Sequence, residues 1–484
     1  MKKLIVISAN YIMRSLFLLV SLIIVWSILF NWSIYYSTDY YLNILGVIGI
    51  IVLLIGILYL TRKMKGSYFI GLLLLIAFSV QLFWIIYSKV EPISDFSYML
   101  NGAKHLANGN FQAVKADDYF FWYTTQLGYP VFEALIIKFS SGSLITLQLM
   151  NSLFILGTIY LIYDSGKNCI NEQAGRIASL FYASYIGLFI MVPVLTNQHS
   201  SAFFIFLGLR LLIHPNFKRT LWMRGLVGLC LAVGNILYPI GILFLISIFL
   251  YIVFYMGISE GGISVIDKLK SIGMVIGVYL LTLFVFSVAL LGLGISNHSI
   301  QHYDNNWKFV LGLNQETNGQ YSLTDFETLL PSYLARDEEE HTKIEKKLIQ
   351  ERLNQPKEVV ELIVNKTLYM WGMPNDSYKY ANIYPSEKKT IEAVKVPYVR
   401  IESSQYFVIS LFMLLSGVCL LVTARNLTNN KLNLYTIAML GGFLIYFIIE
   451  IQVRYRYFFI PMMCLLASYS FSLLSDRVSK RLSK

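Results

Sequence analysis

Apolar residues in this chain gather into long runs, and the lengths of these runs match those of membrane-spanning helices. A helix needs about 20 apolar residues to cross the hydrocarbon of a bilayer. The runs predict about twelve spans, at residues 10–30, 44–61, 68–88, 143–163, 174–195, 199–213, 222–238, 239–257, 271–294, 404–424, 433–450 and 456–475. The two runs that meet at Tyr238-Pro239 can instead form one kinked helix. The run at 129–140 is too short to cross and is expected to lie in the interface. The pattern predicts an all-α polytopic membrane protein.

Composition supports the same class and narrows the chemistry. Of the 484 residues 56% are hydrophobic and only 14% are charged, which does not fit a chain folded around one soluble core. The first run lacks a convincing cleavage site, so we expect a retained span. Cys230, Cys419 and Cys464 fall within predicted spans and Cys169 in a predicted cytoplasmic segment, so no external disulfide is expected. The sequence shows no metal-binding cluster, so we expect no cofactor and no essential divalent metal.

Basic residues concentrate in the short segments on one side of the predicted spans. Lys2, Lys3 and Arg14 lie at the start of the chain, and the C-terminal tail is again rich in Lys and Arg. Cytoplasmic segments of membrane proteins carry such an excess. The net charge of +11 then divides into about +15 on the cytoplasmic side and about −4 outside. The charge pattern predicts a multi-pass plasma-membrane protein with both termini in the cytoplasm, and it gives no indication of a nucleic-acid partner.

Two segments on the outer side are too long to be simple connectors. They divide the chain into two N-terminal spans at 1–67, a transmembrane core at 68–295 with an external loop at 91–128, an external segment at 296–403, and three spans with a basic tail at 404–484. Long loops on a rigid scaffold are where function concentrates. We therefore expect the functional residues, and an extracytoplasmic active site, in these segments.

The first external loop begins with a candidate catalytic acid. Asp95 follows an apolar span directly, and the residues after it have the helical spacing of a short interfacial helix that ends at Gly109-Asn110. The alternative role for Asp95 is an N-cap, for which Ser94 competes. Asp117 and Asp118 follow in an aromatic stretch, either as solvated loop acids or as substrate-binding groups.

Two arginines precede the last predicted span. Arg454 and Arg456 lie at its outer edge, against the positive-inside bias. They either reach lipid headgroups from a helix end or bind a phosphate, for which a planar, permanently charged guanidinium is well suited.

The external segment at 296–403 is mixed in character. Its first part is rich in Gly, Asn and aromatic residues, whereas residues 337–353 carry opposite charges at helical spacing. The latter stretch predicts a solvated helix with His341 on its surface.

Motifs in these segments resemble those of a known family. They are Ser94-Asp95-Phe96 with Tyr98, Gly128-Tyr129-Pro130, Gly312-Leu313-Asn314, Lys366 with Trp371, and Arg454-Tyr455 with Pro461. In order and topological side they resemble the polyprenyl-phosphate-dependent membrane glycosyltransferases of the C superfamily (GT-C). The resemblance is to its protein O-mannosyltransferases and lipid A aminoarabinose transferase, and to bacterial members that decorate the cell surface. It covers roughly residues 68 to 475. The chain departs from the pattern at Phe96, where several relatives carry Glu, and at Tyr238-Pro239, where many carry Arg-Pro.

The resemblance implies an inverting transfer of a monosaccharide from a polyprenyl-phosphate donor to a wall polymer, glycolipid or protein outside the membrane. Asp95 would then be the general base, and Arg454 or Arg456 would hold the donor phosphate. The candidate substrate-binding residues are Tyr98, Asp117, Asp118, Tyr129, Asn314 and Tyr455. A polysaccharide polymerase or ligase, a transporter of lipid-linked sugar and a non-catalytic scaffold remain as alternatives.

Overall fold

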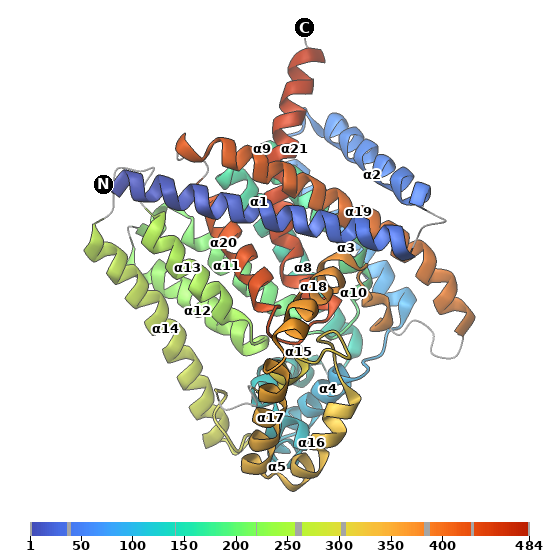
Figure 1. The fold of residues 1–484 in the computed structure, drawn as a ribbon, viewed down its shortest axis with the longest axis vertical. Helices are drawn as coiled ribbons and strands as arrows, with labels where there is room; N and C mark the ends of the chain where they lie inside the picture. Colours follow the sequence, from blue (N-terminus) through green and yellow to red (C-terminus); the bar gives the residue numbers. More distant parts are fainter. Residues whose placement is uncertain are drawn as a thin grey trace.

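The computed structural model describes residues 2–35, 40–140, 142–218, 220–256, 264–301, 306–381, 388–426 and 430–482. Throughout these residues the regular structure is helical, without a strand (Figure 1). The described part of residues 296–403, the predicted external segment, is helical too. The predicted all-α class is therefore confirmed for the described chain.

Within the described ranges, six helices are long and apolar enough to cross a membrane. They are α1 (Lys2–Tyr35), α2 (Tyr40–Thr61), α3 (Gly66–Ser88), α8 (Leu144–Cys169), α14 (Val265–Gly292) and α19 (Lys388–Val422). Shorter apolar helices occupy four more of the predicted spans: α12 (Leu221–Leu237), α13 (Gly241–Phe254), α20 (Leu432–Ile445) and the first part of α21 (Ile460–Leu482). The total of twelve spans remains a prediction. α19 begins well before residue 404, so the predicted boundary there falls inside a helix.

Two apolar runs have a different form from the predicted one. The run at 174–195 is broken into α9 (Glu172–Ser184) and α10 (Ile186–Met191), because Tyr185 between them has an extended backbone. At Tyr238-Pro239 the helices α12 and α13 are separate. Tyr238 is extended, with φ −148° and ψ 124°, as expected for a residue whose helical conformation the following proline disfavours.

Close helix contacts build the apolar core. α21 packs against α9 and α19, α1 packs against α18 (Pro356–Gly372) and α19, and α11 (Gln198–Leu212) lies between α8 and α12. Where α8 meets α9, a Cβ on Gly166 would come within 2.8 Å of the Gly175 Cα. Small residues of this kind let helix backbones approach closely inside a membrane.

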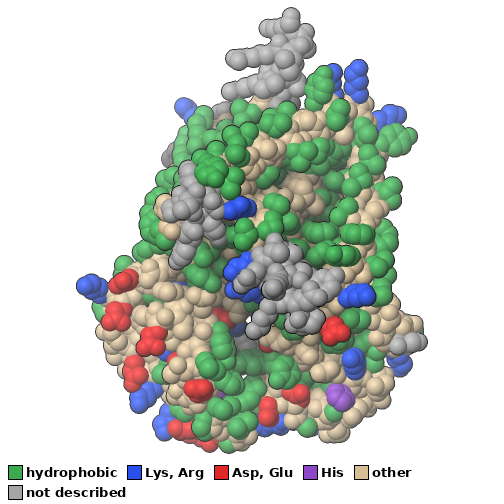
Figure 2. Space-filling view, turned by 90° about the vertical axis from the view of Figure 1, so that its right-hand side faces the viewer, with side chains coloured by type: hydrophobic (Ala, Val, Ile, Leu, Met, Phe, Trp, Pro, Cys, Tyr) green, Lys and Arg blue, Asp and Glu red, His purple; other side chains and the backbone are tan. Residues whose placement is uncertain are grey.

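Helices α4 (Asp95–Ala107), α5 (Phe111–Ala116), α15 (Asn306–Gly312), α16 (Leu323–Ala335) and α17 (Glu338–Leu353) lie toward the end of the molecule opposite the C-terminus (Figure 1). α6 (Asp118–Trp122) contacts α5, and α7 (Gly128–Ser140) contacts α4. In the view of Figure 2, acidic side chains gather at this end, and apolar side chains dominate the rest of the face. This division is the one expected of an extramembrane region on a membrane-embedded core.

Two predicted helices of this region are confirmed. α4 ends at Ala107, and Gly109 follows in the left-handed conformation with φ +73°. α17 begins after Asp337, whose side chain caps it by accepting from the Glu340 amide. The surface position predicted for His341 is wrong. α17 packs against α15 and α16, so His341 is only 4% exposed, with its ring 4.2 Å from that of Trp122.

Candidate functional site

Asp95 lies at the first position of α4, directly after a strained turn. The N-cap position belongs to Ser94, which has φ +54°, a value that a non-glycine residue rarely adopts. The Asp95 side chain is 50% exposed, and its Oδ2 lies 3.7 Å from Arg454 Nη2. The acid therefore does not hold the capping position considered as its alternative role. Instead it faces a cation from the other end of the chain.

Arg454 is held in place on several sides. It belongs to the short helix η5 (Val453–Phe458), and its Nε donates to Gln452 Oε1 at 2.6 Å. The guanidinium carbon lies 4.5 Å from the ring centroid of Tyr380 and 5.4 Å from that of Phe96. Burial lowers the pKa of Arg454, but Tyr455, Tyr380 and Asp95 outweigh it and raise the pKa above its ordinary value. The side chain is a permanent, positioned cation that is 12% exposed.

A second cation, Lys308, lies in the same region. Its ammonium pairs with the carboxylate of Glu450, a buried residue, while the Lys308 side chain itself is 44% exposed. Tyr455 also donates to Glu450, at 3.1 Å, and Gln452 donates to its other oxygen at 2.8 Å. Gln452 thus connects the Lys308–Glu450 pair to Arg454.

Each member of this pair stabilises the charge of the other. Burial raises the pKa of Glu450, but Lys308 outweighs it and holds the pKa below its ordinary value. Loss of water lowers the pKa of Lys308, but Glu450 raises it above its ordinary value. Besides burial, both Asp95 and Glu450 raise the pKa of Tyr321 and that of Tyr455. The two acids and two cations therefore form one electrostatic site.

Of the predicted substrate-binding residues, Tyr98 and Tyr455 belong to this site. Tyr98 is exposed and stacks on Tyr119, with ring centroids 5.3 Å apart. Burial, and after it Asp95, raises the pKa of Tyr119. The stacked pair thus lies near the acid and presents an aromatic face.

Tyr129 lies behind the site instead. It is buried in an apolar cluster with Phe96 and Met99. One helical turn further, both carboxylate oxygens of Glu133 are buried. Burial raises the pKa of Glu133 well above its ordinary value, although the Tyr129 hydroxyl acts in the opposite direction.

The other three candidates have structural partners. Asp117 caps α6 by accepting from the Tyr119 amide at 2.8 Å, and Asp118 forms an ion pair with Arg336 at 2.7 Å. Asn314 is buried and donates to Asp325 at 2.8 Å. These contacts define local structure.

Arg456 occupies a separate, fully buried environment. Its Nη2 lies 3.8 Å from Glu402 Oε1, and its guanidinium carbon lies 4.2 Å from the ring centroid of Tyr406. The side chain has no exposed surface, so it does not reach headgroups as a snorkelling residue would. Of the two arginines, Arg454 is the one that a ligand at Asp95 can reach.

Lys308, Gln452 and Tyr380 were not among the predicted site residues. Lys308 has no distinctive neighbours in sequence, and its partner Glu450 comes from the far end of the chain. No group of three or more His, Cys, Asp or Glu side chains within the described ranges could hold a metal ion.

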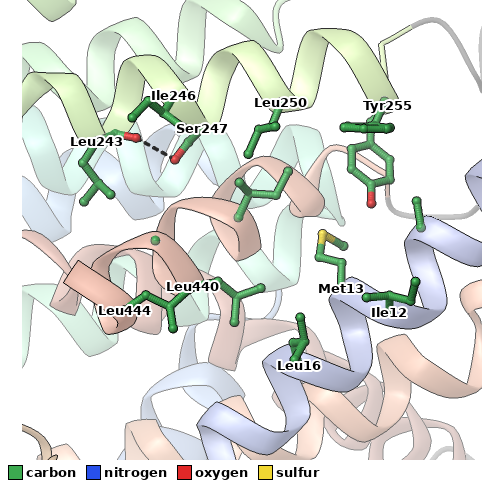
Figure 3. Close-up of a pocket in the computed structure, with 14 residues that line it drawn as sticks. Ile12, Met13, Leu16, Leu243, Ile246, Ser247, Leu250, Tyr255, Leu440 and Leu444 are labelled. Atoms are coloured by element: carbon green, nitrogen blue, oxygen red, sulfur yellow. Dashed lines mark hydrogen bonds between the residues drawn. The ribbon is translucent and has the colours of Figure 1, made fainter. Parts of the chain in front are cut away.

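An apolar pocket of about 410 Å³ lies between α1, α13 and α20 (Figure 3). Its lining includes Ile12, Leu16, Leu243, Ile246, Leu440 and Leu444. Its serine, Ser247, donates to the Leu243 carbonyl at 2.9 Å. Leu444 shortly precedes Tyr446, whose ring stacks on Tyr455. The pocket therefore offers an apolar environment. Leu444, which lines it, is close in sequence to the residues of the charged site.

Comparison with known proteins gives a match in structure but not in sequence. No protein-family model matches the chain, and no curated protein is significantly similar to it. The apo oligosaccharyltransferase of Archaeoglobus fulgidus matches with a TM-score of 0.51 at 12% identity, covering 87% of this chain and 52% of that one. The archaeal enzyme in complex with an inhibitory peptide and a dolichol-phosphate matches with a TM-score of 0.49 at 11% identity, covering 86% and 51%.

This chain thus spans about half the length of the structures that it matches. At such low identity the likeness concerns the fold alone. It shows that this chain shares a fold with the archaeal oligosaccharyltransferase, and it does not single out the O-mannosyltransferase or aminoarabinose transferase type that the sequence motifs resemble.

Proposed function

We propose that this protein is an inverting glycosyltransferase that moves a monosaccharide from a polyprenyl-phosphate donor to an acceptor hydroxyl on the outer face of the plasma membrane. The observation that carries the proposal is the pairing of Asp95 with Arg454, beside the second cation Lys308. A half-exposed carboxylate next to fixed cations combines a base with a phosphate-binding site.

The chemistry needs little more than these groups. Asp95 accepts the proton of the acceptor hydroxyl as its oxygen bonds to the anomeric carbon of the donor. On the opposite face, the bond from that carbon to the phosphate oxygen breaks, and the phosphate leaves with the electron pair. Arg454 and Lys308 offset the charge that develops on it. Because phosphate departs without protonation, a second carboxylic acid of the kind that glycoside hydrolysis uses is not required.

The donor has a lipid tail, and the apolar pocket between α1, α13 and α20 is the proposed place for part of it. The acceptor is a wall polymer, glycolipid or protein. We expect the exposed Tyr98–Tyr119 stack to contribute to its binding, since an aromatic face suits the apolar face of a sugar ring.

The test is transfer by purified protein in lipid vesicles. We expect it to transfer sugar from a polyprenyl-phosphate sugar to a crude wall-polymer acceptor, with inverted anomeric configuration in the product and no need for a nucleotide. Transfer from nucleotide sugars alone, or no transfer with any polyprenyl-phosphate sugar, would contradict the proposal and favour the polymerase or transporter alternatives.

A further inference from the structure

Lys366 makes an unusual set of contacts. It lies in α18, is 1% exposed, and its ammonium donates to three backbone carbonyls. These belong to Gly312 at 2.7 Å, Phe447 at 3.1 Å and Ile449 at 2.8 Å. The first carbonyl ends α15, the helix of Lys308, and the other two precede Glu450.

The segment that Lys366 contacts is the one that carries Arg454. We call residues 447–458 the strap. Its backbone is joined to its surroundings by the Glu450 amide, which donates to the Lys308 carbonyl, and by the Ile451 amide, which donates to that of Gly319, both at 2.8 Å. Lys366 adds three further bonds, two of them to the strap.

Two glycines make room for the close contacts around the Lys366 ammonium. A Cβ on Gly312 would come within 2.3 Å of the Ile448 carbonyl oxygen, so only glycine lets α15 lie so close to the strap. Gly319 has φ +76°, and a Cβ there would lie 2.8 Å from the Lys366 side chain. Buried carbonyls need donors, and an ammonium supplies three rotatable ones, whereas a guanidinium has a planar fork.

We infer that Lys366 is a positioning residue that fixes the strap against α15, so that Arg454 and Lys308 face the same phosphate. It touches neither cation directly and acts through the backbone that carries them. The phosphate as ligand rests on the proposed function, whereas the effect of Lys366 on the strap does not.

Lys366→Met removes all three donors and retains the length of the side chain. We expect at least about tenfold weaker binding of a polyprenyl-phosphate sugar, since three buried carbonyls lose their partners. We expect a smaller loss in Lys366→Arg, because the charge remains but the geometry does not. In an Arg454→Ala background the effect of Lys366→Met should shrink, since the group being positioned is absent.

Asn31→Ala is the matched control. Asn31 donates to the Leu368 carbonyl at 3.0 Å and so fixes the same helix, α18, from α1 without touching the strap. We expect it to lower thermal stability but to leave donor affinity unchanged. Equal loss of donor affinity in Asn31→Ala and Lys366→Met would overturn the inference, because a general loosening of α18 would then explain both.

Amide hydrogen exchange gives a readout that does not depend on the donor. Lys366→Met should speed exchange at Glu450 and Ile451, and Asn31→Ala should not. Unchanged exchange there would refute the positioning role. Faster exchange in a protein whose wild type binds no polyprenyl-phosphate sugar would support the positioning role while the proposed function failed.

Discussion

The two arginines of the strap should respond in opposite ways to the same substitution. Arg454 is 12% exposed and faces Asp95, which is half exposed, whereas Arg456 is fully buried and faces Glu402, which is buried as well. Both were candidates for the phosphate-binding role. Replacing each arginine with Ala therefore shows which of them binds the ligand and which of them stabilises the fold.

For Arg454→Ala we expect a large loss of donor affinity. Truncating one partner of a close charge pair in a binding site costs about 2–5 kcal/mol, which corresponds to roughly 30- to 4,000-fold in affinity. The loss of stability should be about 1–3 kcal/mol, less than the loss expected for Arg456. The ion pair with the half-exposed Asp95 contributes up to about 1 kcal/mol, and each of the contacts with Tyr380 and Phe96 contributes about 0.5–1 kcal/mol.

For Arg456→Ala we expect the reverse. The substitution leaves Glu402 buried without its cation, and an uncompensated buried charge costs about 3–5 kcal/mol of stability. The residual folded protein should bind donor with nearly wild-type affinity, because Arg456 has no surface for a ligand to contact.

The assay combines equilibrium binding of a fluorescent polyprenyl-phosphate sugar with thermal unfolding of the same preparations in detergent. Arg454→Lys serves as the conservative variant, and we expect it to restore binding only in part, since a point charge replaces a bidentate fork. Wild-type donor affinity in Arg454→Ala, or a specific loss of affinity in a stable Arg456→Ala, would refute the assignment of the phosphate to Arg454.

Three further results follow from the structure. Cysteines placed at Asn110 and at Lys347, which is 75% exposed, should react with an impermeant thiol reagent in whole cells, and one at the exposed Lys63 should not; the opposite labelling would invert the proposed orientation. Burial lowers the pKa of Lys366 to about 7, although Glu450 acts in the opposite direction. As pH rises through about 7, the ammonium loses a proton and with it one N–H group for the backbone carbonyls, so affinity for the polyprenyl-phosphate sugar should fall. Glu450 and Lys308 keep their charges in that range because their pKa values are shifted away from it; an equal slope in Lys366→Arg would contradict this cause. Because burial raises the pKa of Glu133 and so favours its neutral form, Glu133→Gln should change stability by less than about 1 kcal/mol, and a large drop in melting temperature would contradict this reasoning.

The local sequence pattern was sufficient to predict the class of protein and several of its helices. Apolar runs predicted the long spans, and helical spacing with Gly109 predicted α4. Length alone did not show that the run at 174–195 breaks at Tyr185, because tertiary packing decides where an apolar run bends. The surface position predicted for His341 failed for a similar reason, since charge periodicity does not show which face of a helix is covered.

The site was predicted only in its separate parts. Asp95 and Arg454 were singled out by position and charge, but their pairing depends on contacts between distant segments. The exclusion of Arg456 from the exposed site follows from burial, which two arginines so close in sequence do not reveal. Lys308 became visible only when the fold placed it against Glu450.

The most direct test of the central claim is the turnover of Asp95→Asn. The substitution is nearly isosteric and removes one ion pair, whose carboxylate is half exposed and which is worth up to about 1 kcal/mol, so the variant should fold and bind the sugar donor. Asp118→Asn is the matched control, since Asp118 is an acid of the same loop with its own ion pair to Arg336. With a polyprenyl-phosphate sugar and a wall-polymer acceptor, we expect at least about 10²-fold lower turnover in Asp95→Asn, because an amide cannot accept the proton of the acceptor hydroxyl, and nearly wild-type turnover in Asp118→Asn. Near-normal turnover in Asp95→Asn would contradict its role as the base.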